Sequence, residues 1–397
     1  MNKTERFLAH QGQTNPFPFL IDVDRAEGIY IYDKLGKAYM DMIAGVAVNN
    51  IGHRHPKVLD AVRAQLDRHL HVMVYGEFIQ DAQLAFAERL SHLLPAPLKS
   101  VYTVNSGTEA NEAALKLAKR VTGRSELIAF KGSYHGSTHG SMSVSANETK
   151  KSAYRPLLPD VRFIQFNVEE DLAWITDRTA GVIVEPIQGD AGVRVPDLSF
   201  VQALRARCTE VGALLIFDEI QCGMGRTGRL FAFDHFDVVP DILTLGKALG
   251  GGMPIGALVA SVEHMREFTL EPMLGHITTF GGHPVICAAG HAALDVLSQE
   301  IDFYEVERLG ALLEELLAHE QEIIAIRRIG MLFAFDMVSE QRVAKVVENC
   351  LEKGLISFWF LSHPYSFRLS PPLNISEDQI KEAAKIILSA IQETRTI

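Results

Sequence analysis

The chain has 397 residues, of which 47% are hydrophobic and 22% charged, so it carries enough apolar material for the buried cores of two or three domains. Its 38 basic and 49 acidic residues give a formal net charge of −11 without any basic block, which argues against nucleic acid and anionic membranes as partners. The four cysteines are far apart and form no CxxC pair, which indicates reduced thiols in a cytoplasmic protein.

The first 45 residues predict an N-terminal arm and an antiparallel segment that belongs to a smaller domain. Residues 28–33 alternate in the manner of a strand, and residues 34–37 follow as a turn. The polar start of the chain lacks the apolar stretch that a signal peptide needs, which again favours a cytoplasmic location.

Residues 46–289 predict a large α/β domain in which short strands alternate with helices. We expect helices at residues 56–70, 81–94 and 109–120, and strands at residues 101–104, 127–130, 181–184, 213–217 and 257–260. Apolar runs this short, separated by helices and bounded by turns, are typical of a mostly parallel sheet with helices on both faces.

From residue 290 the pattern changes to longer helices mixed with strands, which predicts a second, smaller α+β domain at residues 290–397. The expected helices cover residues 288–299, 304–319, 343–353 and 377–393, and the expected strands cover residues 331–337 and 367–369. Residues 272–294 contain no charged side chain, but their three histidines and two prolines argue against a membrane span.

Residues 105–111 (NSGTEAN) lie where a predicted strand leads into a helix. Unpaired amides and the helix dipole make an anion site at such a position, with hydroxyl groups from Ser106 and Thr108 and close backbone approach at Gly107. Taken alone, the fragment favours a plain helix cap that binds nothing.

Asp218 follows the predicted strand 213–217, and a carboxylate at the end of a buried parallel strand faces the crevice where such sheets bind ligands. The alternative is an acid that is solvated in a loop or caps a helix. Residues 219–228 then contain a formal GxGxxG pattern. Because its glycines open onto residues that do not predict a convincing helix, we interpret them as a loop that shapes a pocket.

Lys247 lies among apolar residues and glycines in residues 244–252 (TLGKALGGG). Desolvation would lower the pKa of this amine and suit it to form a Schiff base, although a lone lysine is more often exposed on a flexible loop. The combination with an anion-binding turn and a strand-end carboxylate favours the first interpretation. Pyridoxal phosphate needs a phosphate cup, an acid for its pyridine nitrogen and an amine for its aldehyde.

With these motifs the sequence resembles the class III aminotransferases, a pyridoxal-phosphate family that includes acetylornithine, ornithine and 4-aminobutyrate aminotransferases. The segments that carry the resemblance, in the family's order, are residues 45–56, 105–111, 134–138, 185–189, 217–228, 245–252, 279–282 and 368–372. The resemblance implies the fold type I architecture of pyridoxal-phosphate enzymes and a homodimer with shared active sites.

The resemblance also implies a role for each matched position. Lys247 would bind the cofactor aldehyde, and Asp218 would pair with the pyridinium and make the ring an electron sink. Gln221 would bind the ring hydroxyl, and Ile220 and Tyr134 would pack on opposite faces of the ring. The remaining cofactor positions are Ser106, Gly107, Thr108, His135 and Glu185, with Gly107 and Thr108 on the phosphate.

Two further positions concern the partner subunit and the substrate. Thr279 would reach the phosphate from the other subunit, and Arg368 would grip a substrate carboxylate in the bidentate way that arginine favours. Outside the family context, Arg368 is equally a surface residue at a strand end. The chain departs from the family at Ser137, where arginine is frequent, and at Asp190, where glutamate is frequent, so 4-aminobutyrate fits less well as a substrate.

We expect an amino group to pass from a donor to a 2-oxo acid such as 2-oxoglutarate in a ping-pong cycle, and we favour the terminal amine of ornithine or acetylornithine. One alternative keeps the cofactor but changes the reaction, as in an aminomutase. Another is a nicotinamide dehydrogenase that uses Gly223, Gly225 and Gly228. His53 and His55 have no accompanying carboxylate or cysteine spacing, so we expect no metal site.

Overall fold

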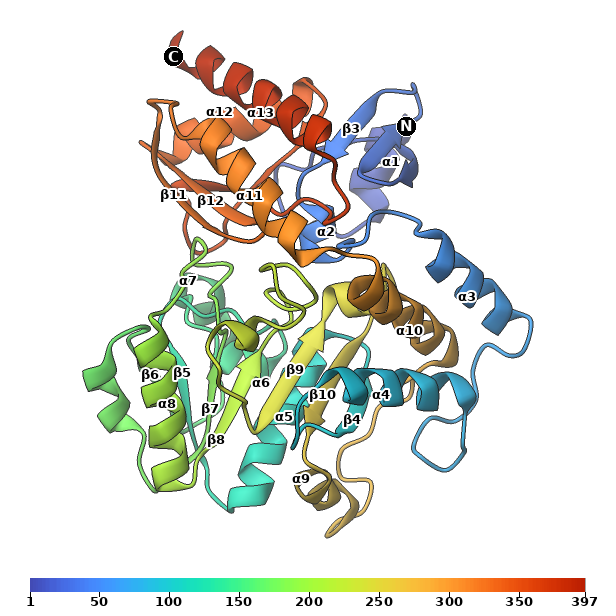
Figure 1. The fold of residues 1–397 in the computed structure, drawn as a ribbon, viewed down its shortest axis with the longest axis vertical. Helices are drawn as coiled ribbons and strands as arrows, with labels where there is room; N and C mark the ends of the chain where they lie inside the picture. The colour runs from blue at the N-terminus through green and yellow to red at the C-terminus, as the bar shows by residue number, and fades with distance from the viewer. Residues whose placement is uncertain (397) are drawn as a thin grey trace.

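A seven-stranded sheet forms the centre of the larger part of the molecule in the computed structural model, which describes residues 1–396 (Figure 1). Its strands, in spatial order, are β4 (Ser100–Val104), β10 (Gly256–Ala260), β9 (Ile242–Gly246), β8 (Leu214–Asp218), β7 (Thr179–Val184), β5 (Glu126–Phe130) and β6 (Val161–Ile164). Only β10 runs antiparallel to its neighbours, so the carboxyl ends of all the other strands of this sheet meet at one edge. The predicted α/β class with a mostly parallel sheet is confirmed.

Alternate residues of these strands enter two different apolar clusters, which shows that both faces of the sheet are buried. Ile183 and Ile216 pack with α5 (Gly107–Thr122), whereas Val182 and Leu215 belong to the cluster that includes residues of the helices on the other face. Helices on that face are α4 (Asp81–Leu93), α8 (Leu198–Val211) and α10 (Pro284–Gln299), and α3 (Pro56–Leu66) packs on α10. Burial on both faces explains why the sequences of these strands are nearly continuous apolar runs.

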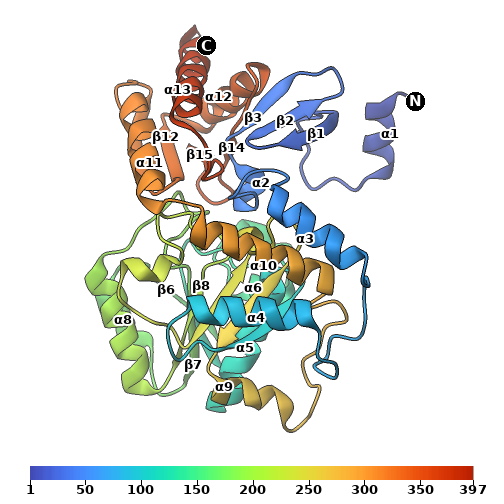
Figure 2. The same cartoon turned by 45° about the vertical axis from the view of Figure 1, so that its right-hand side comes forward.

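The N-terminal and C-terminal segments of the chain both lie above this sheet (Figures 1 and 2). The N-terminal strands β1 (Val23–Glu27), β2 (Tyr30–Asp33) and β3 (Ala38–Asp41) form a sheet with β13 (Leu355–Ile356), which pairs parallel to β3. A second sheet has the order β11 (Ile323–Ile329), β12 (Leu332–Met337), β15 (Ser366–Leu369) and β14 (Phe358–Trp359). These pairings agree with a small domain built from both termini, and its boundaries at residues 45 and 290 stay a prediction.

The C-terminal sheet is accompanied by three amphipathic helices, α11 (Phe303–Leu317), α12 (Glu340–Glu352) and α13 (Glu377–Gln392). In α13, a capping box at Ser376 and Gln379 fixes the start of the helix. Shorter helices are α1 (Lys3–His10), α2 (Ala44–Ala47), α6 (His139–Ser143), α7 (Glu148–Lys151) and α9 (Val262–Arg266). The 3₁₀ helices are η1 (Ser152–Tyr154), η2 (Glu169–Trp174), η3 (Ala232–His235), η4 (Lys247–Gly250), η5 (Glu267–Thr269) and η6 (Glu393–Thr396). Within residues 1–396, no helix combines the length and the apolar character needed to cross a bilayer.

Most expected elements are present, with differences at their ends and seven strands that the sequence pattern did not predict individually. The first expected helix ends at Leu66 instead of residue 70, and the helix expected from residue 109 begins at Gly107, where Ser106 caps it. The unpredicted strands are β1, β3, β6, β9, β11, β13 and β14. The sequence pattern does not predict β9, because its sequence, ILTLG, runs directly into the apolar segment around Lys247.

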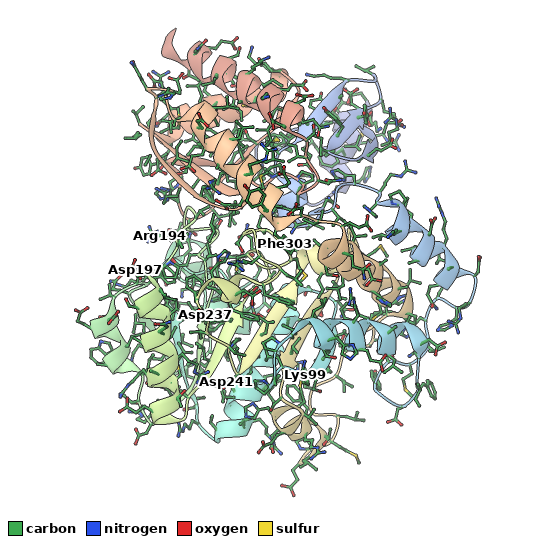
Figure 3. All side chains as sticks on the ribbon, viewed as in Figure 1. Lys99, Arg194, Asp197, Asp237, Asp241 and Phe303 are labelled. Carbon is green, nitrogen blue, oxygen red and sulfur yellow. The ribbon has the colours of Figure 1, made fainter. Side chains whose placement is uncertain are left out.

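The glycine-containing loop after β8 packs against the small C-terminal part of the molecule instead of opening a long helix. A Cβ atom at Gly225 would lie 2.8 Å from Leu373 and 2.9 Å from Phe303, which lies at the junction of the two parts in Figure 3. This close packing explains the glycine without a bound dinucleotide.

Arg226, in the same loop, is fully buried and joins three distant parts of the chain. Its Nη1 donates to the carbonyl oxygens of Met331 at 3.0 Å and Pro371 at 2.5 Å, and Nη2 donates to Asn50 Oδ1. Burial lowers the pKa of Arg226 to about 9, which still leaves the guanidinium protonated at neutral pH.

We predict that Arg226→Met lowers stability by about 3–5 kcal/mol, because three buried oxygen acceptors lose their donor. The urea midpoint of unfolding measures this loss. Arg229→Met, at an exposed position three residues later, is the matched control and should leave the midpoint within error. Equal midpoints for the two variants would contradict the joining role of Arg226.

Candidate active site

The predicted lysine and aspartate lie side by side at the carboxyl edge of the large sheet. Asp218 is the last residue of β8, and Lys247 directly follows Gly246, the last residue of the neighbouring parallel strand β9. The register pairs Asp218 with Thr244. At the opposite edge of the sheet, Asp241 forms an ion pair with Arg205 at 2.8 Å. Figure 3 labels Asp241 at the lower end of the sheet.

The N-terminus of α5 meets the same edge through a close backbone contact. A Cβ atom at Gly107 would lie 2.7 Å from the Ile220 side chain, and one at Gly246 would lie 3.3 Å from it. Ile220 therefore packs on both glycines and connects the start of α5 with the ends of β8 and β9. Thr108, in the first turn, has its Oγ1 2.8 Å from Thr138 Oγ1. The first amides of a helix lack an acceptor within the helix, and in α5 Ser106 Oγ accepts from one of them, the Glu109 amide.

The Asp218 carboxylate is held by three donors. Its Oδ2 accepts from Asn111 Nδ2 at 2.8 Å and lies 2.7 Å from His135 Nδ1, and Oδ1 accepts from the Ile220 amide at 3.0 Å. Thr244 Oγ1 donates to Asn111 Oδ1 at 2.8 Å, which fixes the amide orientation. Asn111 lay within a recognised motif, but neither it nor Thr244 was predicted as a site residue, because their contacts span more than a hundred positions of the sequence.

Lys247 has a strained backbone and an unpaired amine. Its φ angle is 47°, in the left-handed region that costs a non-glycine residue about 1–3 kcal/mol. Its Nζ makes no hydrogen bond or ion pair with any residue that the structure describes. Burial lowers the pKa of Lys247, and the nearby positive charge of Arg368 lowers it further.

Glu185, directly after β7, fixes the backbone around the site. Its carboxylate accepts from the Tyr134 amide at 2.9 Å and from the Gly189 amide at 3.1 Å. Burial raises the pKa of Glu185 to about 7, against the effect of these two donors and of His135. The Tyr134 hydroxyl lies 3.1 Å from Ser137 Oγ.

Gln221 lies beside this backbone: a Cβ atom at Gly189 would meet Gln221 Oε1 at 2.2 Å. The side chain therefore occupies the space above Gly189, between the ends of β7 and β8.

Arg368 comes from the small part of the molecule, on β15, and is 5% exposed. Its Cζ lies 5.5 Å from the Phe358 ring centre and 5.6 Å from that of Phe360. Within residues 1–396 its guanidinium forms no hydrogen bond or ion pair. Asp190, 3% exposed, lies in the loop after β7 and accepts instead from the Leu361 amide and Ser362 Oγ.

Thr279 is the predicted residue that stands apart from this group. It is exposed, forms no hydrogen bond with the described residues, and lines a hollow together with Glu109, Lys116 and His276. His53 pairs with Asp41 at 2.9 Å, and residues 1–396 contain no group of three or more potential metal ligands.

The group at the carboxyl edge fits pyridoxal phosphate on observations of this structure. The unpaired amine of Lys247 is the nucleophile that an aldehyde requires, and a hydrogen-bonded carboxylate lies on the adjacent strand. The first turn of α5 offers backbone amides and Thr108 to a phosphate.

Comparison with known proteins shows the family to which the chain is similar. A model of the class-III aminotransferase family matches residues 11–391. The acetylornithine aminotransferase of Methanopyrus kandleri is 38% identical over 385 residues, which cover 96% of this chain and 97% of that protein.

Solved structures agree with the sequence comparison. The ornithine aminotransferase of Toxoplasma gondii ME49 superimposes with a TM-score of 0.92 at 30% identity and covers 100% of this chain and 96% of its own. A second structure of the Toxoplasma gondii enzyme, with TM-score 0.90 at 30% identity, covers 99% of this chain and 95% of its own, and has pyridoxal phosphate at partial occupancy in its active site. The cofactor of the present enzyme is accordingly pyridoxal 5′-phosphate, and the chain belongs to the class-III aminotransferases.

Proposed function

We propose that this aminotransferase moves the terminal amine of an ornithine-type amino acid, ornithine or acetylornithine, to a 2-oxo acid such as 2-oxoglutarate. The observation that carries the proposal is the buried, unpaired guanidinium of Arg368 in the same site as the unpaired amine of Lys247. Donor and acceptor share a carboxylate, which the planar fork of Arg368 binds in two hydrogen bonds. Full-length similarity to acetylornithine aminotransferases supports the choice of donor.

The residues around Lys247 have separate tasks in this proposal. Bound pyridoxal phosphate supplies an aldehyde that condenses with amines and a ring that accepts electron density from the donor carbon. Gly107 and Thr108, with Ser106 as the helix cap, bind the phosphate, and Gln221 binds the ring hydroxyl. Ile220 and Tyr134 enclose the ring from opposite faces.

Asp218 and Lys247 handle the protons. Asp218 keeps the ring nitrogen protonated by accepting a hydrogen bond from it, and its three donors fix the position of the carboxylate. His135 and Glu185 position this acid and the Tyr134 backbone. Lys247, with its pKa lowered by burial, is available as the base that moves a proton from the donor carbon.

We further propose a homodimer. Two segments, residues 66–84 and 270–280, carry exposed large apolar side chains, of which Ile79 is 91% and Met273 77% exposed, and both segments line one hollow. An apolar surface of this extent on a water-soluble enzyme requires a covering partner, and a second copy of the chain is the partner that the similarity to the family supports. Thr279 lies in the second segment, where it would reach the partner's phosphate site.

A panel of amino donors with 2-oxoglutarate, followed by mass spectrometry, tests the proposed reaction. We expect ornithine or acetylornithine to give glutamate in a reaction that requires the 2-oxo acid. An aminomutase would give an isomer of the donor without 2-oxoglutarate, and that result would replace the proposal. If neither ornithine nor acetylornithine reacts but another amino donor gives glutamate, only the identity of the donor in the proposal is wrong.

We predict that Asp218→Asn slows turnover about a hundredfold or more while the cofactor stays bound, because an amide cannot hold the ring nitrogen protonated. Asp241→Asn, at the opposite edge of the same sheet, is the matched control and should keep near wild-type turnover. Steady-state kinetics of both variants at saturating cofactor measure the difference. Near wild-type activity with Asn at position 218 would contradict the electron-sink role.

We predict that Arg368→Lys lowers kcat/KM for 2-oxoglutarate about ten- to a hundredfold, since lysine lacks the planar fork and a charge-assisted hydrogen bond contributes about 1.5–3 kcal/mol. Arg205→Lys, away from the site, is the control. Ser137→Arg should improve the use of 4-aminobutyrate, which carries a distal carboxylate. Unchanged 2-oxoglutarate kinetics in Arg368→Lys would show that the carboxylate is bound elsewhere.

We predict that mixing Thr279→Ala and Lys247→Ala subunits restores activity at a cofactor concentration that leaves Thr279→Ala mostly empty. One of the two hybrid sites combines an intact Lys247 with an intact Thr279 from the partner. Activity is measured before and after subunit exchange, which native mass spectrometry verifies. Exchange without recovered activity would indicate that Thr279 acts within its own chain.

A further inference from the structure

Three hydroxyl side chains and one carboxylate form a compact cluster beside the N-terminus of α5. Thr108 Oγ1 lies 2.8 Å from Thr138 Oγ1 and 2.5 Å from Ser141 Oγ, and the oxygens of Thr138 and Ser141 are 2.9 Å apart. Glu112, one turn further along α5, completes the cluster. Its Oε1 accepts from the Thr138 hydroxyl and, at 3.0 Å, from the Ser141 amide. Of these four side chains, only Thr108 has a role in the proposed function.

Two glycines leave the space that this cluster occupies. A Cβ atom at Gly136 would clash with Thr108 Oγ1 and would lie 2.6 Å from Ser141 Oγ. A Cβ atom at Gly140 would lie 2.7 Å from Glu112 Cδ. The backbone at both glycines therefore packs closely over the hydroxyls and the carboxylate, and any larger residue there would push them apart.

The direction of each hydrogen bond in the cluster follows from which groups can donate. An ionised carboxylate only accepts, so the Thr138 hydroxyl proton points to Glu112. A backbone amide only donates, so Thr108 Oγ1 accepts from the Thr138 amide, which lies 3.3 Å away. Thr138 thus has no hydroxyl proton left for Thr108. In the 2.5 Å contact between Thr108 and Ser141, one of these two hydroxyls is the donor.

Distance and burial favour Ser141 as this donor. Ser141 is 0% exposed, and its acceptors within the described residues are Thr108 Oγ1 at 2.5 Å, Thr138 Oγ1 at 2.9 Å and the Thr138 carbonyl oxygen at 3.3 Å. The nearest of them belongs to Thr108, which is partly exposed at the start of α5. With Ser141 as donor, Thr108 Oγ1 accepts two hydrogen bonds and keeps its own proton for a ligand. A phosphate anion is a stronger acceptor for that proton than the neutral Thr138 hydroxyl.

We propose that Ser141 is a cofactor-positioning residue, which donates to Thr108 Oγ1 and thereby turns the Thr108 proton toward the phosphate of pyridoxal phosphate. The inference rests on the proposed role of Thr108 in binding that phosphate. Ser141 fixes the rotamer of Thr108, and its donation polarises the Thr108 hydroxyl, which strengthens the next hydrogen bond in the chain. Because Ser141 is buried, it acts through Thr108 and does not contact the phosphate itself.

The test measures how tightly the full-length protein, freed of cofactor, binds pyridoxal phosphate and pyridoxal, which has the same ring and aldehyde but no phosphate. The absorbance of the ligand bound to Lys247 follows both titrations. The variants are Ser141→Ala, Thr108→Ala and the double variant. Ser143→Ala is the matched control, because Ser143 is a buried serine of the same helix, α6, and donates to the His139 carbonyl oxygen at 2.6 Å.

We expect Ser141→Ala to weaken the binding of pyridoxal phosphate about three- to tenfold, the size of one neutral hydrogen bond, and to leave pyridoxal binding and the control unchanged. Thr108→Ala should weaken it about ten- to a hundredfold, because a hydrogen bond to a charged acceptor is lost. In the double variant Ser141→Ala should add no further loss, since its effect passes through Thr108. The ³¹P NMR signal of the cofactor bound to Ser141→Ala should move toward its position in Thr108→Ala.

An equal loss of affinity for pyridoxal and pyridoxal phosphate in Ser141→Ala would overturn the inference, and so would losses that simply multiply in the double variant. Thr108→Ala separates the failure of the inference from that of the proposed function. If Thr108→Ala weakens the binding of pyridoxal phosphate and Ser141→Ala does not, only the role of Ser141 is wrong. If Thr108→Ala leaves this binding unchanged, the phosphate is bound elsewhere and the proposed phosphate site is wrong as well.

Discussion

The packing of Ile220 on Gly107 and Gly246 is the contact on which the geometry of the site depends. It is so close that no side chain fits at position 107 without moving Ile220. The contact sets the start of α5 against the ends of β8 and β9 and therefore brings the helix amides, Asp218 and Lys247 to one place. Each of these groups has an ordinary structural explanation in its own segment, and only their convergence gives a cofactor site.

The charges at this edge follow a consistent pattern. The carboxylates of Asp218, Glu185 and Asp190 each accept from two or more hydrogen-bond donors. The Lys247 amine and the Arg368 guanidinium form no hydrogen bond with the described residues. The protein has thus given the three acids hydrogen-bond donors and has left unpaired the two basic side chains that must react with or bind something else. This arrangement lowers the stability of the fold, because two basic groups are buried without a partner and Lys247 has a strained φ angle.

The sequence was sufficient for the fold class and the family but not for the contacts that organise the site. Asp218 could be found because it follows an apolar run of strand length, and Lys247 because it lies among apolar residues and glycines. The family resemblance gave both residues roles that stay predictions. The bond from Ser362 to Asp190 spans 172 positions and that from Thr244 to Asn111 spans 133, distances over which no local pattern carries information. The helix ends at Leu66 and Gly107 depend on caps and tertiary packing, which periodicity does not encode.

Borohydride reduction of the holoenzyme, followed by peptide mapping, tests the central claim most directly. Reduction makes the link between the cofactor aldehyde and its lysine permanent, so mass spectrometry can locate it. The structure predicts one modified peptide, with the cofactor on Lys247, because this amine lies unpaired beside Asp218 at the end of β9. Modification of any other lysine, with Lys247 unlabelled, would contradict the account.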